Sequence, residues 1–206
     1  MIQSTMDLIN GGLVTSLSGL EFIFLYLLHN PDVQRRVQAE IDDVIGSDRQ
    51  PSWDDRSALP YTTATIVESL RLGCVSPSTL PHVATEDSTI EDYHVPKGTH
   101  VLASLFCLHR QPDVFEDPES FRPERHVDID GSLKNFENMM PFGVAPRFCL
   151  GDDWFHVFAF LIVTSVLQRY SLGLPAGKEL PPFTTRMRVV RRLVPFTVVL
   201  TSRSAT

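Results

Sequence analysis

The stretch PFGVAPRFCLG, residues 141–151, places a lone arginine and a lone cysteine on a loop rich in glycine and proline. The next residues, DDWFHVFAFLIVTSVLQRY at 152–170, have a nearly unbroken apolar pattern that predicts a helix. Cys149 therefore lies just before a helix N-terminus, where unpaired N–H groups favour an anion such as a thiolate. Arg147 adds a positive charge two residues earlier. This pattern indicates a thiolate that acts either as a nucleophile or as an axial metal ligand.

The composition is that of an ordinary globular protein. Of the 206 residues, 43% are hydrophobic and 21% are charged, which is enough for one sizeable core. The formal net charge of −7 argues against a nucleic-acid partner. The three cysteines, Cys74, Cys107 and Cys149, contain no Cys-x-x-Cys pair, which argues against a disulfide framework and against a structural zinc site.

The apolar segments of the chain are short. The longest runs begin at Phe22, Val157 and Val194, and each falls short of the ~18 apolar residues that suggest a membrane-spanning helix. We therefore expect no signal peptide and no spanning segment in this chain. The first thirty residues have the pattern of a helix interior and not that of a helix start.

Periodicity and turn signals predict one helix-rich unit with a small β portion. We expect five helices: residues 6–29, 31–45 with Asn30 as cap, a short one capped by Ser52, 60–72 and 152–170. We expect strands at residues 89–95 and 99–104, and a strand pair after the loop at 174–182, of which residues 194–201 are the clearer strand. Gly11, Gly12 and Gly19 inside the first helix indicate a kink or the close approach of another group.

Three kinds of chemistry remain open for Cys149. A nucleophile in a cysteine-dependent hydrolase needs a nearby base, and His156 is the candidate in the following helix. Zinc needs several ligands at short spacing, and the sequence has none around Cys149. Haem iron needs a single protein thiolate, because the porphyrin supplies the in-plane ligands.

The cysteine loop resembles the haem-binding signature of the cytochromes P450, Phe-x-x-Gly-x-Arg-x-Cys-x-Gly. The residues that carry the resemblance are Phe142, Gly143, Arg147, Cys149 and Gly151. Ala145 stands where the family usually has glycine. If that position needs a positive φ, alanine adds strain of about 1 kcal/mol.

Two further segments are similar to motifs of the same family. VESLRLG contains Glu68 and Arg71 three residues apart, and FRPERH contains Arg125. The resemblance implies that these three side chains form a buried structural triad that braces the haem side of the core. His126 replaces the usual aromatic residue.

The first helix is similar to the family's dioxygen-side helix. By that resemblance Gly12 would widen the helix groove over the haem, and Thr15 and Ser16 would help to deliver protons to dioxygen. The usual acidic residue of this motif is Val14 here, and a valine carries no proton.

The resemblance also implies partners for the rest of the haem site. His82 and Arg147 would contact the haem propionates. The wall of the substrate pocket would come from residues 75–80 and from the loop at 182–187. The candidate pocket residues are Val75, Ser76, Ser78, Thr79, Leu80 and Phe183.

Together these segments identify the chain as a member of the cytochrome P450 family, of the microsomal animal type that metabolises drugs and steroids. The implied fold is mainly α with a small β portion, the C-terminal half of the P450 fold, with residues 1–206 as one partial domain and the N-terminal half absent. The implied reaction is haem-thiolate monooxygenation of a lipophilic small molecule, an oxidoreductase activity that uses haem b iron.

The implied partners are dioxygen and an NADPH-dependent flavoprotein reductase. The implied location is the cytoplasmic face of the endoplasmic reticulum membrane, reached through an anchor absent from this chain. The alternative is a truncated or degenerate relative without catalytic activity, at most a haem-binding or interaction fragment, and the departures at Val14 and Ala145 favour it.

Overall fold

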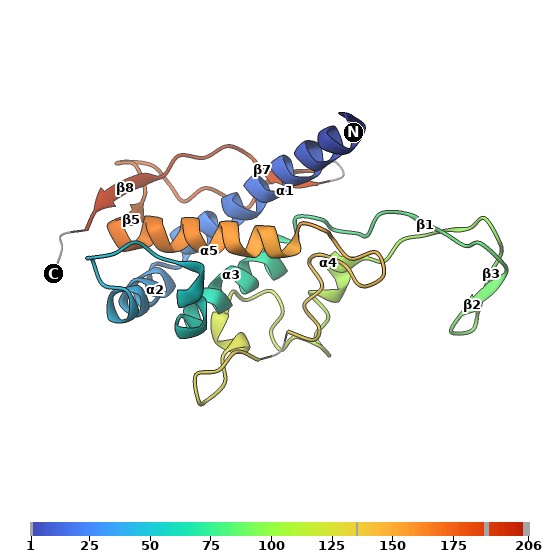
Figure 1. The fold of residues 1–206 in the computed structure, drawn as a ribbon, viewed down its shortest axis with the longest axis horizontal. Coiled ribbons are helices and arrows are strands. Elements are labelled where there is room, and N and C mark those ends of the chain that lie inside the picture. The colour runs from blue at the N-terminus through green and yellow to red at the C-terminus, as the bar shows by residue number, and fades with distance from the viewer. Residues whose placement is uncertain (1, 135, 188–189, 204–206) are drawn as a thin grey trace.

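Helices dominate the computed structural model, which describes residues 2–134, 136–187 and 190–203 (Figure 1). The prediction of a mainly α fold with a small β portion is therefore confirmed. The α-helices are α1 Ile2–His29, α2 Pro31–Val44, α3 Pro60–Gly73, α4 Leu105–Leu108 and α5 Asp152–Arg169. Two 3-10 helices are η1 Trp53–Ala58 and η2 Pro123–His126.

Within the described residues the strands form four separate two-stranded antiparallel sheets. Two of these sheets lie on an arm that extends from the helical body in Figure 1. They pair β1 His82–Val83 with β4 His100–Val101, and β2 Ser88–Ile90 with β3 Tyr93–Val95. The other two pair β5 Tyr170–Gly173 with β8 Val199–Ser202, and β6 Thr185–Met187 with β7 Arg191–Leu193.

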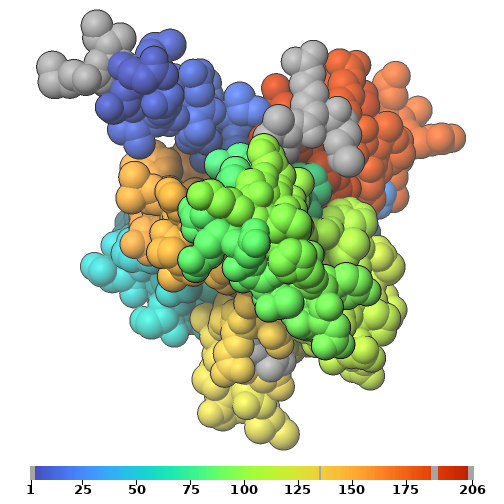
Figure 2. Space-filling model, turned by 90° about the vertical axis from the view of Figure 1, so that its right-hand side faces the viewer, coloured from blue at the N-terminus to red at the C-terminus, as the bar shows by residue number. Residues whose placement is uncertain are grey.

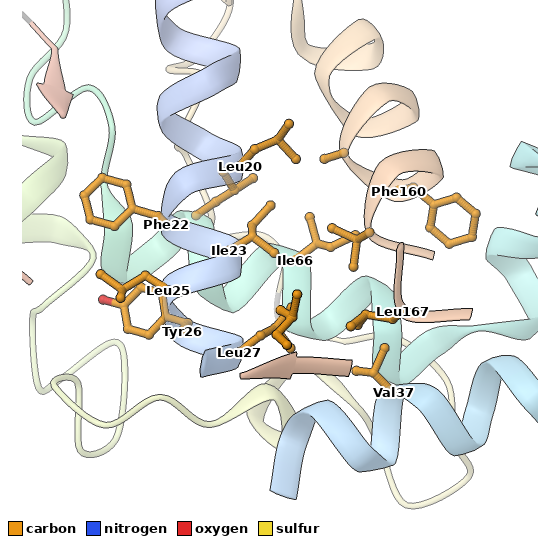
Figure 3. Packing of buried hydrophobic residues seen from close by; sticks show 14 of the residues in the cluster. Leu20, Phe22, Ile23, Leu25, Tyr26, Leu27, Val37, Ile66, Phe160 and Leu167 are labelled. Atoms are coloured by element: carbon orange, nitrogen blue, oxygen red, sulfur yellow. The ribbon is translucent and has the colours of Figure 1, made fainter. Parts of the chain in front are cut away.

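The hydrophobic core lies between the C-terminal half of α1 and the helices α2, α3 and α5. Ile23, Leu25 and Leu27 of α1 have no exposed surface. Figure 3 shows Ile23 and Leu27 on the side of α1 that faces Ile66 of α3 and Leu167 of α5, and Leu25 on the other side beside Tyr26. A fully buried leucine or isoleucine contributes about 1.5–3 kcal/mol, so this helix junction is the main source of stability.

The two halves of α1 have different surroundings. Residues 20–28 are mostly buried, whereas apolar side chains of the N-terminal half are exposed: Met6, Leu8, Ile9, Leu13 and Leu17. By length and composition residues 3–29 could cross a membrane, contrary to the expectation from the short apolar runs. Burial of the C-terminal half shows that this part of α1 is a core helix, and the N-terminal half projects from the body in Figure 2.

Gly19 marks the place where α1 crosses α5. A Cβ atom at Gly19 would lie 2.6 Å from the ring of Phe155 in α5, a distance that real Cβ atoms do not adopt. A Cβ atom at Gly11 or Gly12 would have no neighbour within 4 Å. The close approach predicted from the glycines is thus confirmed at Gly19, while Gly11 and Gly12 lie beside open space.

Three of the expected strands differ from those observed. Residues 89–95 form a hairpin of β2 and β3 instead of one strand, because Glu91 turns the chain with a positive φ of 50°. The expected strand at 194–201 is replaced by the shorter β8, which pairs with β5 directly after α5. Only His100 and Val101 of the expected strand at 99–104 form a ladder. Short strands depend on their partners more than on propensity, which explains these errors.

The expected helix boundaries are close to those observed, but one cap is different. Ser52 and Asp55 form the predicted capping box at the start of η1. The Asn30 side chain does not cap α2, and its amide donates instead to the Tyr26 carbonyl at 2.8 Å. Asn30 therefore closes the end of α1, while Pro31 begins α2.

The C-terminal segment holds the end of α5. The Arg203 guanidinium donates to the carbonyls of Leu167 at 2.7 Å and Gln168 at 3.2 Å, and it also contacts Asp42 of α2. Carbonyls in the last turn of a helix have no partners within the helix. Arg203 supplies partners for two of them and links α5 to α2.

We predict that Gly19→Ala destabilises the protein by about 1–3 kcal/mol, because the added methyl group overlaps the buried Phe155 ring. Gly11→Ala is the matched control in the same helix and should be stabilising by about 0.5–1 kcal/mol through helix propensity. The measurement is urea unfolding followed by circular dichroism. Equal effects of the two substitutions would contradict this account of the crossing.

Candidate functional site

The loop that carries Cys149 is closed on itself by backbone hydrogen bonds. The Cys149 N–H donates to the Phe142 carbonyl at 2.9 Å, and the Arg147 N–H donates to the Val144 carbonyl at 3.1 Å. Phe142 packs against Phe155 of α5 with ring centroids 5.8 Å apart. The first residue of the signature thus attaches the loop to α5, and the cysteine is placed by the closing bond.

Cys149 is exposed and precedes α5, as the sequence predicts. The Phe155 N–H donates to the Gly151 carbonyl, which begins the helix. Asp152 and Asp153 occupy the first turn of α5 and weaken the positive potential that an anion finds there. Cys149 is nevertheless exposed at the start of the helix, where a ligand can reach its sulfur.

Gly143, not Ala145, has the unusual backbone of the loop. The φ of Gly143 is +79°, a region that favours glycine, and Ala145 has no positive φ. The strain expected for Ala145 is therefore absent. A Cβ atom at Gly151 would lie 3.8 Å from the Cys149 sulfur, an ordinary contact distance, so the backbone of Gly151 passes close to the thiol.

One face of α1 is directed toward the start of α5. Gly12, Thr15 and Gly19 lie three, four and seven residues apart, so they share a helix face. Gly19 touches Phe155, whose ring in turn packs on Phe142 of the cysteine loop. Toward the N-terminus α1 diverges from α5 (Figure 1), and the space beside Gly12 is open.

The polar groups of this face are partly engaged within the helix. The Thr15 hydroxyl donates to the Gly11 carbonyl at 2.5 Å, and Ser16 is buried. Val14 is 37% exposed. Among the described residues of this helix turn, Thr15 and Ser16 supply the hydroxyl groups, and neither Leu13 nor Val14 can carry a proton.

Glu68, Arg71 and Arg125 lie together, as the resemblance implies. The Arg71 guanidinium donates to the Glu68 carboxylate through Nε at 2.8 Å and through Nη2 at 2.9 Å. The Arg125 Nε donates to the same carboxylate at 2.9 Å. Glu68 and Arg71 have no exposed side-chain surface, so this is a buried charge cluster.

The Glu68 carboxyl is held ionised. Burial alone would raise its pKa, but the hydrogen bonds from Arg71 and His126 and the charge of Arg71 outweigh burial and lower the pKa to about 2. The backbone N–H of Arg122 also donates to this carboxylate, at 3.0 Å. Each carboxylate oxygen thus has at least two donors, which is what a buried charge requires.

The sequence signals missed two buried histidines near this cluster. His126 Nε2 lies 3.0 Å from the Glu68 carboxylate, so His126 joins the triad as a fourth member. His109 is also fully buried, and its carbonyl accepts from Arg71 at 2.6 Å. Only the replacement of an aromatic residue by His126 was visible as a signal in the sequence.

The expected propionate partners both reach the surface. His82 is exposed on β1, and Arg147 is exposed on the cysteine loop. A propionate carboxylate prefers such cationic or donor side chains at a solvent-facing edge. The roles of His82 and Arg147 stay predictions.

Residues 75–80, expected in the pocket wall, form an irregular half-buried segment after α3. Two backbone hydrogen bonds fix it to α4 and the residues just before it: Thr79 N–H to the Ala103 carbonyl, and Phe106 N–H to the Pro77 carbonyl. Ser76 donates to the Ser78 carbonyl at 3.0 Å, and Val75 packs on the core. Leu80 is 73% exposed.

The structure does not bring Phe183 to the Thr15 region. The Phe183 ring packs on Tyr26 at 4.5 Å and on His29 at 4.6 Å, at the far end of α1. Tyr26 lies eleven residues beyond Thr15, or roughly 16 Å along the helix. Packing on the buried Tyr26 ring and the half-buried His29 ring decides the position of Phe183, which the order of motifs could not reveal.

His156 is engaged by other groups than the thiol. His156 Nε2 lies 3.3 Å from the Asp152 carboxylate, and its ring packs edge-on against Phe142. His156, Asp152 and Phe142 line a cavity of about 140 Å³. Its other lining residues are Val67, Leu70, Met139, Pro141 and Phe148. The contacts of the described residues give no support to a Cys149–His156 nucleophile pair.

The described residues fit a thiolate-ligated haem. One exposed thiol stands at the start of α5, and the opposite wall is the Gly12 and Thr15 face of α1, beside which a Cβ atom at Gly12 would have no neighbour. Among the described residues no group of three or more histidine, cysteine or acidic side chains could hold a metal ion. A metal at Cys149 therefore needs in-plane ligands that the protein does not supply, which a porphyrin provides.

Comparisons with known proteins agree with this geometry. The family model described as Cytochrome P450 matches residues 1–200. The chain is 39% identical over 197 residues to mouse "Cytochrome P450 2U1", covering 96% of this chain and 37% of that protein. It is 38% identical over 206 residues to "Steroid 17-alpha-hydroxylase/17,20 lyase" of Ictalurus punctatus, covering 99% of this chain and 40% of that protein.

A solved structure gives the same result for the fold. The chain superposes on "Zebra fish cytochrome P450 another structure with Abiraterone" with a TM-score of 0.88 and 36% identity, covering 96% of this chain and 47% of that one. The chain thus spans about two fifths of the length of the curated relatives it matches.

The buried cluster generates a pH-dependent prediction. Because the pKa of Glu68 is lower in the folded protein than its ordinary 4.5, its ionisation contributes stability above pH 4.5 that is lost as the pH falls toward 2. We predict that Glu68→Gln lowers the free energy of unfolding at pH 7 by about 3 kcal/mol. The variant should also lose less stability than the parent between pH 4.5 and 2.

The matched control is Glu116→Gln, since the Glu116 side chain is 88% exposed and makes only a long ion pair with Arg122. This control should change stability by no more than about 0.5 kcal/mol. Urea unfolding at a series of pH values measures both effects. A Glu68→Gln variant with unchanged stability at pH 7 would overturn the importance given to this cluster.

Proposed function

The chain belongs to the cytochrome P450 family, and from this premise we propose that it supplies the haem-ligating portion of a haem-thiolate monooxygenase. Members of this family are haem-containing monooxygenases. The proposed substrate is a lipophilic small molecule, into which one oxygen atom of dioxygen is inserted. Since the chain spans about two fifths of its relatives, the activity proposed is that of a longer protein.

One observation carries the proposal. Cys149 is exposed on a closed loop at the start of α5, and the Gly12 and Thr15 face of α1 diverges from the same end of α5. A flat cofactor bound through sulfur would have that face of α1 as its other wall. When bound, a thiolate-ligated haem supplies the oxidation chemistry, because sulfur donates electron density that favours cleavage of dioxygen.

The side chains of this protein would bind the cofactor and handle protons. Cys149 would hold the iron through its sulfur, with Gly143, whose φ is +79°, allowing the tight turn of the loop. Arg147 and His82 would donate hydrogen bonds to the two propionates. The Thr15 hydroxyl donates to the Gly11 carbonyl in this structure. In the proposed enzyme it would instead form a hydrogen bond with water or with a group on the substrate side of the site.

Substrate binding would rely on the wall formed by residues 75–80. This segment is half-buried and is held by backbone hydrogen bonds to residues 103–106, so it would present a stable surface. Its exposed Leu80 is apolar, which favours a lipophilic ligand. The relatives named above include a steroid hydroxylase, and a substrate of similar size and polarity is the expectation here.

The proposal includes the partners of microsomal relatives. Electrons would come from NADPH through a flavoprotein reductase that docks on the cysteine side of the protein. The location would be the endoplasmic reticulum membrane, on its cytoplasmic face. The exposed apolar residues of the N-terminal half of α1 would then be covered by other parts of the longer protein.

One observation favours a second candidate function, that of a haem-binding relative without catalysis. Val14 occupies the acidic position of the dioxygen-side motif and cannot deliver a proton. Proton delivery would then depend on Thr15, Ser16 and water. In this second candidate the protein binds haem but does not oxidise a substrate.

We predict that the chain, supplied with haem, reduced and treated with carbon monoxide, gives the Soret band of thiolate-ligated haem from which the family takes its name. Cys149→Ala should abolish this band, because it removes the sulfur ligand. Cys107→Ala is the matched control, since Cys107 is also an exposed free cysteine but lies on α4.

Difference absorption spectra check this prediction. A band that survives in Cys149→Ala, or that disappears equally in Cys107→Ala, would refute the assignment of the ligand. A band in the parent without substrate oxidation by the full-length protein would favour the second candidate.

A further inference from the structure

His109 touches both the buried charge cluster and the segment that leads into the cysteine loop. It follows α4 as its C-cap and has no exposed surface. Its backbone carbonyl accepts from the Arg71 guanidinium at 2.6 Å, and its ring Nε2 accepts from the Met140 backbone N–H at 3.2 Å. His109 is therefore a bridge between α3 and the start of the loop.

A short series of backbone hydrogen bonds continues from Met140 to the cysteine. The Met140 carbonyl accepts from the Gly143 N–H at 3.1 Å, and the Phe142 carbonyl accepts from the Cys149 N–H at 2.9 Å. The position of Met140 thus fixes the first turn of the loop, and the loop closure fixes Cys149. The His109 contact ties this series to the Arg71 side of the core through a side-chain hydrogen bond.

The hydrogen bond defines the state of the His109 ring. A backbone N–H is a donor, so Nε2 must present its lone pair, and the proton of the neutral ring must sit on Nδ1. Nδ1 is buried and has no hydrogen-bond partner among the described residues. Leaving a buried donor unpaired costs stability, so packing alone does not explain a histidine at this position.

The groups around the ring keep it neutral. Burial comes first, followed by the positive charges of Arg71 and Arg110, and together they lower the pKa of His109 to about 4, against the opposing charge of Glu68. The Phe115 ring packs edge-on at 6.3 Å. At neutral pH the Nε2 lone pair is therefore available to Met140.

We propose that His109 is a positioning residue for the haem-ligating loop, whose neutral imidazole fixes Met140 and thereby places Cys149 relative to the Glu68–Arg71 pair. His109 touches neither the sulfur nor the reacting atoms, and it acts through the loop backbone. The role of His109 in haem ligation rests on the proposed function. The hydrogen bond between His109 and Met140 does not depend on that function.

Two substitutions separate the acceptor from the shape of the ring. His109→Phe keeps a planar ring but has no acceptor for Met140. His109→Gln places an amide oxygen near the position of Nε2 and should rescue the bond. If His109→Phe fails to fold, His109→Asn replaces it, because its shorter side chain reaches only the position of Nδ1.

The first readout is amide hydrogen exchange, which needs no haem. Loss of the bond should make the Met140 amide exchange about tenfold faster in the Phe or Asn variant. The Gln variant should retain the slow exchange. The amides of Ile23 and Leu27 in the core report global folding and should keep their protection in every variant.

The second readout is the thiolate Soret band of the haem-loaded, carbon monoxide-treated protein. The band should lose intensity in the Phe or Asn variant and be restored in the Gln variant, at equal haem content. The proposal is overturned if the acceptor-free variant keeps both the slow Met140 exchange and the band, or if the Gln variant loses both with the core amides protected. Absence of the band in the parent would count against the proposed function, and the exchange experiment would still decide the hydrogen bond.

Discussion

The buried pair of Glu68 and Arg71 is the constraint on which the rest of this structure depends. Two charges without exposed surface lose several kcal/mol of hydration each, and only good geometry and additional donors compensate. Arg71 therefore binds three backbone carbonyls as well as Glu68: those of His109, Pro118 and Ser120. The remaining hydrogen bonds to the Glu68 carboxylate come from Arg125, His126 and the Arg122 N–H. One buried pair thus fixes the irregular chain between α4 and η2, a region with little regular structure of its own.

The crossing of α1 and α5 is a second constraint: the two helices are in close contact at Gly19, and there is open space beside Gly12. Gly19 allows α1 to lie on Phe155, and the helices then diverge toward the cysteine loop. The position of the crossing sets how far the Thr15 face lies from the start of α5. Phe155 also packs on Phe142, so the same aromatic ring contacts both α1 and the loop. Fold stability and site geometry therefore share the same contacts.

Sequence reasoning succeeded where chemistry is local and failed where it depends on distant partners. The cysteine loop, the Glu68–Arg71 spacing and the Ser52 capping box are set within a few residues, and the structure contains each of them. The family resemblance supplied Arg125, because no local rule joins it to Glu68. The hairpin turn at Glu91 and the short β8 were missed, since strand length depends on the partner strand. His109 was missed because an acceptor for the N–H of a residue 31 positions away leaves no pattern in the sequence.

The attachment of the C-terminal strand to α5 has a consequence for biogenesis. β8 pairs with β5, and Arg203 then binds the last carbonyls of α5 and reaches Asp42. During translation at about 5–20 residues per second, α5 emerges before β8 and Arg203 have been synthesised, although Asp42 is already present. The end of this helix stays frayed on the ribosome until the final strand arrives. A nascent chain stalled before β8 would thus leave the end of α5 without these contacts, even though the helices described here up to α5 have been synthesised.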